Sequence, residues 1–573
     1  MRMKNSELKT DSFRYKRKVK KGSKKIIKVR RKSKKILTYL LFGRILVILF
    51  LLAIQFLFLF SIGRFLNPIL SYVVNGVNIL SFIFMIFLVN NNSKPEFKLA
   101  WMIPVAVIPV FGVLFYIFFR TNIGAVGLRK ALETTTKEMK DSLQPDPEVQ
   151  TVVKHTPLLN DTAWYLQNSG GFPAYMNFTA SYFPSGEANY SDIMTELKTA
   201  KRFVFIEYFI IGMGKIWDSI LEILIKKAKQ GVEIRVMYDG IGSMMLLPSG
   251  YPEYLGTFGI KAKVFAPLIP ILSTHQNSRD HRKIFVIDGR VGYTGGVNIE
   301  DEYMNLRHTR FAYWKDTAVK ISGQAVKTLT ALFLQTWNLN EKKPDDWDFY
   351  TKMSDTPDVV PPLSLSGTLA SSVLLQQNLS KLDAKTPPER TGGFVIPYGD
   401  DGVNLEDIAE NVYCDILNKA RWYVHITTPY MILDNTLETA LTFAVKRGVE
   451  VSILVPAKAD HFVTFCIGRT FIKTLIDKGV RVYEYVPGFI HAKMFISDGD
   501  RAVIGTINLD YRSLFHHFEC GVFIYGNPVI RDMEDDFKLT QKNCREITLE
   551  EYKKIPVYQR MIGRIARMFS PLL

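Results

Sequence analysis

The chain has 573 residues, of which 22% are charged, and a net charge of +18; it is long enough for more than one domain. The charge is uneven, because residues 1–36 carry 17 Lys and Arg against Glu7 and Asp11, a balance of +15 that leaves about +3 for the rest. A basic surface for nucleic acid over the whole protein is therefore not indicated. The four scattered cysteines lack CxxC spacing and indicate neither a disulfide framework nor a zinc site.

The basic segment at 1–36 is too charged to fold alone, and we expect a disordered tail. It ends directly against an apolar run. A polybasic segment in this place is typical of attraction to anionic lipid head groups and of the inner side of a membrane. Nucleic-acid binding by the tail is the alternative.

The region 37–120 is predicted to be transmembrane. Its candidate spans are 45–63, 69–89 and 99–119. Each is long enough to cross a bilayer, and Pro104 and Pro109 are tolerated inside such a helix. A cleavable signal peptide is not indicated, because the basic region is far too long. The orientation stays open, since three crossings place the rest outside whereas the basic residues after the last run favour the inside.

After a helical connector at 121–175, strands and helices alternate twice. The segment AKRFVFIE from Ala200 resembles ARWYVHIT from Ala420, and each is followed by a helical stretch, a glycine turn and a β-branched strand. This pattern predicts an α/β fold with two similar sheet-and-helix halves, at 176–340 and 395–550. The stretch 341–394 between them is rich in Pro, Ser, Asp and Lys and is predicted to be a linker or surface insertion.

A motif occurs once in each half. The first copy reads HRKIFVIDGRVGYTGGVNIEDEY from His281, and the second reads HAKMFISDGDRAVIGTINLDYR from His491. The matching positions, all 210 residues apart, are His281 and His491, Lys283 and Lys493, Asp288 and Asp498, Gly295 and Gly505, and Asn298 and Asn508. A lone His-x-Lys strand usually means nothing, but two copies with four matching offsets are hard to obtain by accident.

The two motifs together would make a site for a phosphodiester. Each looks like a buried strand running into an Asp-Gly turn, and strand alternation places His281, Lys283 and Phe285 on one face. Two such faces bring together two imidazoles, two ammonium groups and two amides, which can neutralise and bind phosphate oxygens. One imidazole can attack phosphorus while the other protonates the departing alcohol. These donors replace a metal ion, so we expect neither a metal nor a cofactor.

The paired motifs resemble the HxK(x)4D signature of the phospholipase D superfamily. Their flanks resemble bacterial cardiolipin synthases: the first is followed by Trp314-Lys315-Asp316-Thr317, the second continues to SLFHHFE, and an earlier segment reads KLAWMIPVAVIPVFGVLFYIFFR. The likeness runs from about residue 95 to the C-terminus. The chain departs from the family pattern at Ala318, where a histidine is common, and at His516-His517, which replace a more usual Leu-Asn. Neither change touches the repeated core.

The resemblance implies two phospholipase D-like halves and a multi-pass protein of the bacterial cell membrane. It suggests two spans and a cytoplasmic catalytic part, whereas the sequence offers three apolar runs. Phosphatidylglycerol and cardiolipin are the implied lipid partners, and nucleic acid is not expected.

The implied reaction is transphosphatidylation. A motif histidine attacks the phosphorus of one phosphatidylglycerol, glycerol leaves, and a second phosphatidylglycerol accepts the phosphatidyl group to give cardiolipin. By superfamily analogy His281 is the nucleophile and His491 the acid and base. Phosphate binding is assigned to Lys283, Lys493, Asn298 and Asn508. Asp288 and Asp498 are expected to orient the imidazoles or stabilise their charge.

Other polar residues are weaker candidates. Glu207 sits mid-strand, where a charge needs a partner; it is predicted to be either a substrate-site residue that pairs with a motif histidine or part of a structural ion pair. His425 occupies the matching strand of the second half. The remaining histidines at 275, 461, 516 and 517 are expected to be polar fillers or pocket wall.

Three other activities fit the motifs: a phospholipase D that yields phosphatidic acid, a phosphatidyltransferase that uses another alcohol, and a membrane-tethered nuclease, which the near-neutral body disfavours. A lipid-binding scaffold with a dead site belongs to a different class, and both motifs being intact argues against it. The segment 551–573 sets apolar residues against arginines. It predicts an amphipathic helix that lies either on a membrane surface or on its own domain.

Overall fold

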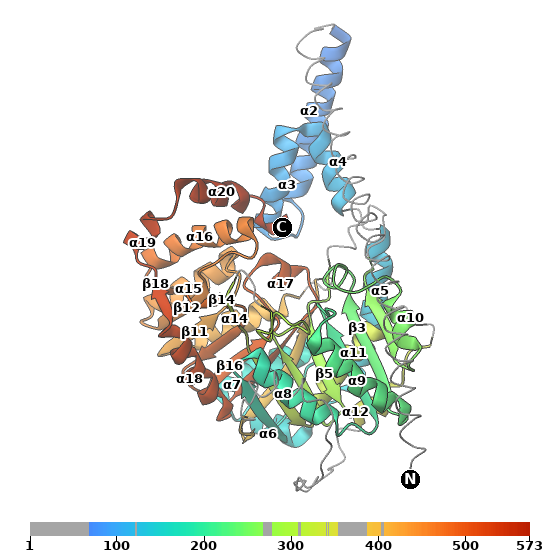
Figure 1. Cartoon of the computed structure of the whole chain (residues 1–573). Helices are drawn as coiled ribbons and strands as arrows, with labels where there is room; N and C mark the ends of the chain where they lie inside the picture. Colours follow the sequence, from blue (N-terminus) through green and yellow to red (C-terminus); the bar gives the residue numbers. More distant parts are fainter. Residues whose placement is uncertain are drawn as a thin grey trace, which may run out of the picture.

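Two eight-stranded sheets form the body of the protein (Figure 1). The computed structural model describes residues 68–120, 123–267, 278–307, 311–339, 341, 343–352, 387–402 and 406–572. The predicted basic tail at 1–36 and the first candidate span at 45–63 lie outside the described residues.

The first sheet has the strand order β4-β3-β2-β5-β6-β8-β1-β9. Its strands are β1 (Phe178–Phe183), β2 (Phe203–Tyr208), β3 (Glu233–Asp239), β4 (Lys261–Phe265), β5 (Lys283–Ile287), β6 (Val291–Gly295), β8 (Ala318–Gly323) and β9 (Arg390–Thr391). β2, β3 and β4 run parallel, and the strands from β5 to β1 pair antiparallel. β2 and β5 are buried along their whole length, which explains their nearly continuous apolar sequence.

The second sheet has the order β10-β17-β16-β15-β11-β12-β13-β18. Its strands are β10 (Phe394–Asp400), β11 (Tyr423–Thr427), β12 (Glu450–Pro456), β13 (Arg481–Tyr485), β15 (Met494–Ser497), β16 (Arg501–Gly505), β17 (Glu519–Tyr525) and β18 (Cys544–Glu546). Read backwards from β13 to β10, it repeats the order from β4 to β1, and β18 and β9 are additions at opposite edges. The predicted α/β fold with two similar halves is confirmed. β9 lies within the segment that was predicted to be a linker.

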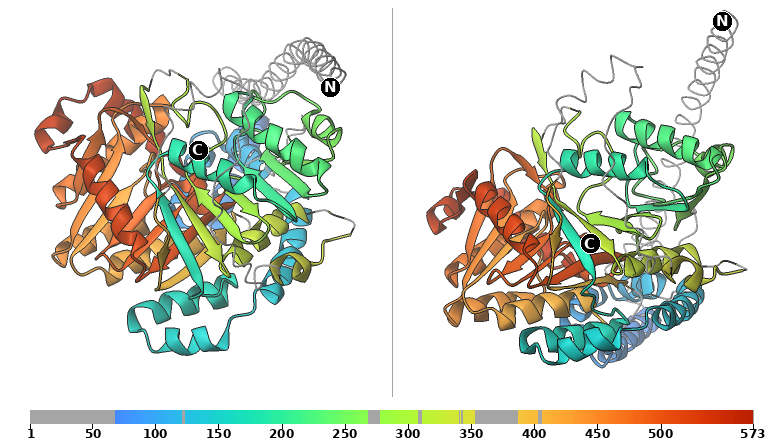
Figure 2. Two further views of the ribbon diagram at one scale, coloured as in Figure 1. Left: turned by 60° about the horizontal axis from the view of Figure 1, so that its bottom comes forward. Right: turned by 90° about the horizontal axis from the view of Figure 1, so that it is seen from below.

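One apolar core runs through both halves, which lie side by side in Figure 2. The helix α11 (Val326–Trp337) is buried at every position except Lys327 and packs on β2 and β5 of the first sheet and on β10 of the second. Helices on the outer faces include α8 (Gly186–Leu197), α9 (Lys215–Lys229), α14 (Ile408–Lys419) and α15 (Asn435–Lys446). The helix α18 (Val529–Gln541) instead contacts β1 of the first sheet and β11 and β15 of the second. Because a close-packed core resists sliding, the relative position of the two sheets is fixed.

Two strand pairings link the halves directly. β7 (Tyr313–Lys315) pairs in parallel with β14 (Gly488–Ile490), and Asp280 forms an isolated bridge with Phe518. The close approach at Gly488 requires glycine, because a Cβ there would lie 1.7 Å from the carbonyl oxygen of Tyr313. Each pairing ends immediately before a motif histidine, so the pairings place both histidines at the boundary between the halves.

Three helices of the described part of the N-terminal region project from the sheets (Figure 1). They are α2 (Pro68–Val89), α3 (Pro95–Val107) and α4 (Pro109–Arg120). The segment of the span predicted at 99–119 is not one continuous helix, since the chain leaves the helical conformation at Ile108, with φ −135° and ψ 76°. Pro109 lacks an N–H and disfavours the helical conformation in the residue before it. In the described part of the chain, no helix combines the length and the apolarity needed to cross a bilayer.

The connector and the C-terminus are helical. The connector contains α5 (Ile123–Ser142), α6 (Pro147–Lys154), α7 (Pro157–Tyr165) and the short π-helix η1 (Leu166–Gly170). The chain ends with α19 (Leu549–Lys553), α20 (Val557–Arg567) and the 3₁₀ turn η5 (Ser570–Leu572), which packs on α3. The C-terminus therefore lies beside the projecting helices (Figure 1).

Candidate active site

The repeated motifs form the predicted strands and turns. β5 and β15 end at Asp-Gly turns in which Asp288, Gly289, Asp498 and Gly499 have φ between 53° and 71°. Aspartate and glycine are among the residues that best tolerate this left-handed conformation. The turn positions matter for the predicted roles of the two aspartates, because their carboxylates point back to the neighbouring strand.

Asp288 and Asp498 hold backbone and do not hold the imidazoles. The Asp288 carboxylate accepts hydrogen bonds from the backbone N–H groups of residues 201, 202 and 203, at 2.7–2.9 Å. Asp498 accepts three equivalent bonds from residues 421, 422 and 423, at 2.8–2.9 Å. The prediction that these carboxylates orient the histidines is therefore wrong. They fasten the start of β2 and β11 to the motif strand.

Each motif histidine is held by the opposite half. The N–H of His281 donates to the carbonyl of Phe518 (2.9 Å), and its Nδ1 lies 2.9 and 3.0 Å from the two carboxylate oxygens of Glu519. The N–H of His491 donates to the carbonyl of Lys315 (2.7 Å), and its Nδ1 lies 2.7 Å from Asp316. All four side chains of these two pairs are buried. A carboxylate bonded to Nδ1–H leaves the Nε2 lone pair available for reaction.

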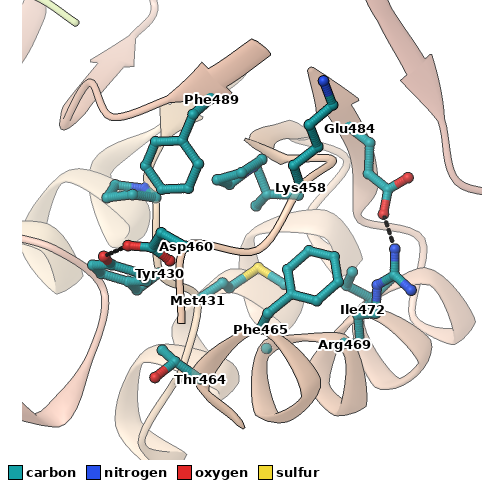
Figure 3. A pocket seen from close by; sticks show the side chains of 14 residues that line it. Tyr430, Met431, Lys458, Asp460, Thr464, Phe465, Arg469, Ile472, Glu484 and Phe489 are labelled. Atoms are coloured by element: carbon teal, nitrogen blue, oxygen red, sulfur yellow. Dashed lines mark hydrogen bonds and ion pairs between the residues drawn. The ribbon is translucent and has the colours of Figure 1, made fainter. Parts of the chain in front are cut away.

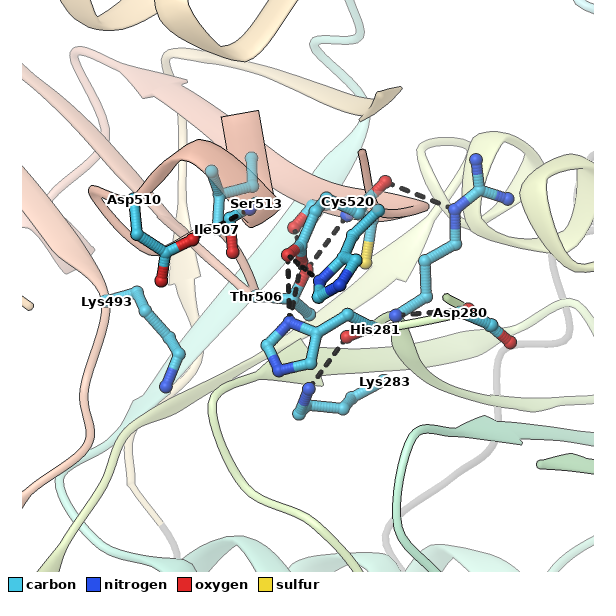
Figure 4. Close-up of polar contacts among 12 residues, drawn as sticks. Asp280, His281, Lys283, Lys493, Thr506, Ile507, Asp510, Ser513 and Cys520 are labelled. Atoms are coloured by element: carbon cyan, nitrogen blue, oxygen red, sulfur yellow. Dashed lines mark hydrogen bonds and ion pairs between the residues drawn. The ribbon is translucent and has the colours of Figure 1, made fainter. Parts of the chain in front are cut away.

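Both motif lysines are buried and face the same region. Lys283 donates to the carbonyl of His281 (2.7 Å), and Lys493 donates to that of His491. Figure 4 shows both ammonium groups on the same side as the free edge of the His281 ring. Burial lowers the pKa of Lys283 to about 8 and that of Lys493 to about 7. An anion bound here would restore the charged form of both.

The surroundings keep both imidazoles neutral. Burial, then the charge of Lys493, lowers the pKa of His491 to about 4, although Asp316 opposes this shift. Burial, together with Lys283, Lys493 and His491, lowers the pKa of His281 well below its ordinary value. These mutual effects require the two histidines and two lysines to lie close together. The structure thus brings four of the predicted residues into one site.

The two motif asparagines differ in their contacts. The Oδ1 of Asn298 accepts from the N–H of Ile210 (3.1 Å), whereas the buried Oδ1 of Asn508 has no hydrogen-bond partner among the described residues. A free buried amide oxygen requires a ligand or water to satisfy it. Asn508 is therefore the better placed of the two to contact a bound molecule.

Glu207 and His425 lie away from the imidazoles. Glu207 accepts from Thr336 (2.7 Å), and burial and the adjacent Asp280 carboxyl raise its pKa well above the usual range. His425 bonds to Glu534 (3.0 Å) and stacks on Phe537. Neither contacts a motif histidine, so the prediction of Glu207 as a histidine partner is wrong. His461 is exposed at the start of α16 (Phe462–Asp477), and His275 lies outside the described residues.

Sequence reasoning missed the two carboxylates that hold the imidazoles. Asp316 stands in the Trp-Lys-Asp-Thr flank and Glu519 in the His-His-Phe-Glu flank, and both flanks contributed to the resemblance. Their spacing from the motif histidines differs, 35 residues for Asp316 and 28 for Glu519. The 210-residue offset that relates the two motifs therefore does not relate Asp316 to Glu519. The sequence signal that could have identified these two carboxylates was their place in the two flanks.

His517 stands beside the first pair. Its ring lies 5.7 Å from that of His281, and neither of its nitrogens has a hydrogen-bond partner among the described residues. With His281 and Glu519 it forms a group whose donor atoms lie within 4.8 Å of one another, a set that can hold a divalent metal. The ammonium groups of Lys283 and Lys493 oppose a cation at this point. That the site works without a metal stays a prediction.

A small pocket adjoins the second motif (Figure 3). Phe489 in its wall lies 6.2 Å from His491, measured between ring centres. On another side, Arg469 of α16 donates to Glu484 of β13 (3.1 Å). The pocket contains neither motif histidine.

Comparison with known proteins matches the same regions. The family described as "Cardiolipin synthase, PLD-like domain" matches residues 193–337 and 413–540, which contain both motifs. A cardiolipin synthase of Halalkalibacterium halodurans is 31% identical over 531 residues, which cover 90% of this chain and 98% of that protein. The chain belongs to the cardiolipin synthase family.

Other relatives extend this likeness along the chain. A cardiolipin synthase of Geobacillus sp. (strain WCH70) is 31% identical over 92% of this chain and 99% of its own length. An uncharacterized protein of Streptococcus mutans is 40% identical over 85% of this chain and 99% of its own length. The family described as "Phospholipase_D-nuclease N-terminal" matches residues 76–120, in the projecting helices. The cardiolipin synthase family is one of phosphatidyltransferases of the phospholipase D type, so this chain is an enzyme of that class.

Proposed function

We propose that the enzyme transfers a phosphatidyl group from one phosphatidylglycerol to a second, which gives cardiolipin and glycerol. The observation that carries the proposal is the pair of imidazoles whose Nδ1 atoms bind Glu519 and Asp316 of the opposite halves. Two such rings beside two buried ammonium groups suit a phosphodiester, which needs charge neutralisation, a nucleophile and an acid.

His281 is the proposed nucleophile. Burial lowers its pKa well below the ordinary value, so its Nε2 carries a lone pair at neutral pH. The choice of His281 over His491 follows the superfamily analogy. Nε2 attacks the phosphorus, a phosphorus–nitrogen bond forms, and the bond from phosphorus to the glycerol oxygen breaks. The positive charge that develops on the His281 ring is balanced by Glu519 through Nδ1–H.

His491 is the proposed acid and base. A bound phosphate anion raises the pKa of a neighbouring imidazole, which opposes the effect of burial and lets His491 take up a proton. That proton passes to the departing glycerol oxygen. The neutral His491 then removes the proton from the terminal hydroxyl of the second phosphatidylglycerol, whose oxygen attacks phosphorus and displaces His281.

Lys283, Lys493 and Asn508 are proposed to hold the phosphate oxygens. The two lysines supply charge, and the Nδ2–H groups of Asn508 supply donors. Asn298 is proposed to contribute its amide N–H groups from the other motif, because its Oδ1 is already bonded to Ile210.

The decisive assay uses the purified full chain in detergent with labelled phosphatidylglycerol. Cardiolipin and glycerol in equal amounts would support the proposal. Phosphatidic acid as the sole product would replace it with a hydrolase, and a product that forms only with another added alcohol would replace the acceptor. Lipid binding without turnover would indicate a scaffold.

We further propose that the protein is a multi-pass protein of the cell membrane and that its basic tail attracts anionic lipid. The support is compositional, namely the apolar runs at 45–63 and 69–89 and the charge of residues 1–36. Protease access to the tail and to 341–394 in intact cells and in inverted vesicles tests the arrangement. Full cleavage of both segments from both sides would contradict it.

A further inference from the structure

The C-terminal helix α20 presses one face onto the second half. At Gly563 an added Cβ would lie 2.2 Å from the carbonyl oxygen of Cys466 in α16, so the two helices touch there. Arg469 of α16 donates to Gln559 of α20 (2.9 Å) and to Glu484 of β13 (3.1 Å). The sequence left two places open for this helix, on its own domain or on a membrane surface. α20 packs on its own domain, and it presents a second face away from that domain.

The opposite face of α20 is apolar and exposed. Its side chains recur at helical spacing and are between 48% and 62% exposed: Val557, Tyr558, Met561, Ile565 and Met568. Single exposed apolar residues are common on protein surfaces, whereas a contiguous stripe marks a binding surface.

Positive charge accompanies this stripe. Residues 552–573 contain five Lys and Arg and no Asp or Glu. Arg567 is used within the protein, since it lies over the Phe471 ring and 3.4 Å from Glu438. Arg564 is exposed and forms no ion pair within the described residues. The face therefore combines an apolar stripe with cations at its flank, which complements an anionic lipid surface.

The stripe lies at the end of the molecule from which α2, α3 and α4 project (Figure 1). The last turn, η5, packs on α3, and Leu572 packs against the small core of the projecting helices that includes Trp101. Large apolar side chains are exposed on those helices too, among them Ile79, Leu80 and Leu99. Exposed apolar side chains thus occur on α20 and on the projecting helices at the same end of the protein.

We propose that the exposed face of α20 docks on the surface of a bilayer that contains anionic phospholipid. The apolar stripe lies at the level of the acyl chains, and Arg560 and Arg564 lie among the phosphates. The docking itself is argued from the surface of α20, whereas the reason why docking would matter to the enzyme rests on the proposed function. The Pro571 carbonyl lies 3.3 Å from Nε2 of His516, which stands three residues before the histidine partner Glu519, so docking brings the site to its lipid substrate.

The test labels the full chain with an environment-sensitive fluorophore at Ile565→Cys. Cys414→Ser and Cys544→Ser leave the buried Cys466 and Cys520 as the remaining native thiols. Leu539→Cys in α18 is the matched control, because Leu539 is 61% exposed and Ile565 60%. The protein is placed in nanodiscs of phosphatidylcholine alone or of phosphatidylcholine and phosphatidylglycerol in equal parts.

In discs with phosphatidylglycerol, we expect acrylamide quenching at position 565 to fall about threefold or more relative to detergent, with a smaller fall in phosphatidylcholine discs and none at 539. Unchanged quenching at 565 would overturn the proposal. Protection at 565 in lipid-free detergent that grows with protein concentration would also overturn it, in favour of a second copy of the chain. Equal protection in both disc types would overturn the anionic part.

A second pair of variants examines the arginines without touching the site. Arg560→Gln with Arg564→Gln should weaken the phosphatidylglycerol dependence by about fivefold per charge, and retained dependence would contradict their role. Cardiolipin formation in detergent micelles is measured on the same samples. If it fails while the label is still protected, the proposed function falls and the docking surface stands.

Discussion

The two motif histidines come from segments of equal spacing, yet their surroundings differ. His281 binds both oxygens of Glu519, and Thr506 donates to the same carboxylate. His491 binds Asp316, and the position that matches Thr506 by the 210-residue offset is Gly296, where a Cβ would lie 2.0 Å from the Asp316 carboxylate. The two copies of the motif are therefore alike in sequence spacing, but the carboxylates that bind their histidines have different surroundings.

This difference separates the two rings chemically. Burial raises the pKa of Glu519 to about 7, so the partner of His281 gains a proton as the pH falls through 7, and burial lowers the pKa of His281 well below its ordinary value. His491 keeps a pKa of about 4 and has an aspartate 2.7 Å away. A near-symmetrical motif can therefore place two imidazoles beside unlike carboxylates, which allows the two rings to take different roles in the reaction.

The largest effect is expected from removing either ring. His281→Asn and His491→Asn should each lower turnover by roughly 10⁴-fold or more, because each step needs both. They should differ in one measurement. With rapid acid-free quenching and labelled phosphatidylglycerol, His491→Asn should still accumulate phosphoenzyme slowly, whereas His281→Asn should form none.

The reverse pattern would exchange the two roles while leaving the site intact. Normal turnover in either variant would remove that histidine from the mechanism altogether. Lys458→Gln, a change of an exposed side chain in the neighbouring pocket, serves as the control for general damage to the second half.

The next largest effect is expected from the two carboxylates. Asp316→Asn and Glu519→Gln keep size but lose charge, so each should lower kcat by about 10²- to 10⁴-fold through loss of imidazole orientation. The loss should be larger for Asp316→Asn if His491 carries the proton. Steady-state kcat for both variants checks this, and an unchanged kcat in Asp316→Asn would contradict the assigned partnership.

Gly296→Ala should be the next in size, about 10²-fold in kcat. The added methyl group meets the Asp316 carboxylate at 2.0 Å and the carbonyl of His491 at 2.9 Å, so Asp316 must leave its place. Gly256→Ala, where nothing lies within 4 Å of the new Cβ, is the matched control and should keep full activity. Equal kcat in the two variants would show that Asp316 can move to accommodate the methyl group without loss of activity.

The strands, the turns and the duplication could be predicted from the sequence because the motif residues recur at constant spacings along the chain. Such spacings can be recognised without knowledge of how the chain packs. The sequence predicted the meeting of His281, Lys283, His491 and Lys493 for the same reason. It did not predict the carboxylate partners, because each comes from the opposite half at a spacing that is not repeated. Strand pairing across the halves, such as β7 with β14, decides that contact, and it is a property of the packed chain.

A smaller effect on kcat/KM is expected from the titration of the two motif lysines. The pKa of Lys493 is lowered to about 7 and that of Lys283 to about 8, so both ammonium groups are present at lower pH and are lost as pH rises through these values. kcat/KM, which reports the free enzyme, should therefore fall above about pH 7. Lys493→Arg keeps its charge and should move this fall upward. A profile that is flat from pH 6 to 9 in the unaltered enzyme would contradict the assignment.

The smallest effect on activity is expected at the two aspartates that the motif itself suggests as imidazole partners. Asp288→Asn keeps a residue that tolerates the left-handed turn but weakens three bonds to backbone N–H groups. We expect about 2 kcal/mol lower stability, from the usual value of hydrogen bonds to charged groups, with kcat within about twofold. Thermal unfolding and initial rates on one preparation separate the two quantities. If kcat fell by 10²-fold with an unchanged unfolding midpoint, Asp288 would act on the imidazole after all, and the distinction between the motif carboxylates that hold backbone and the flanking carboxylates that hold histidine would be lost.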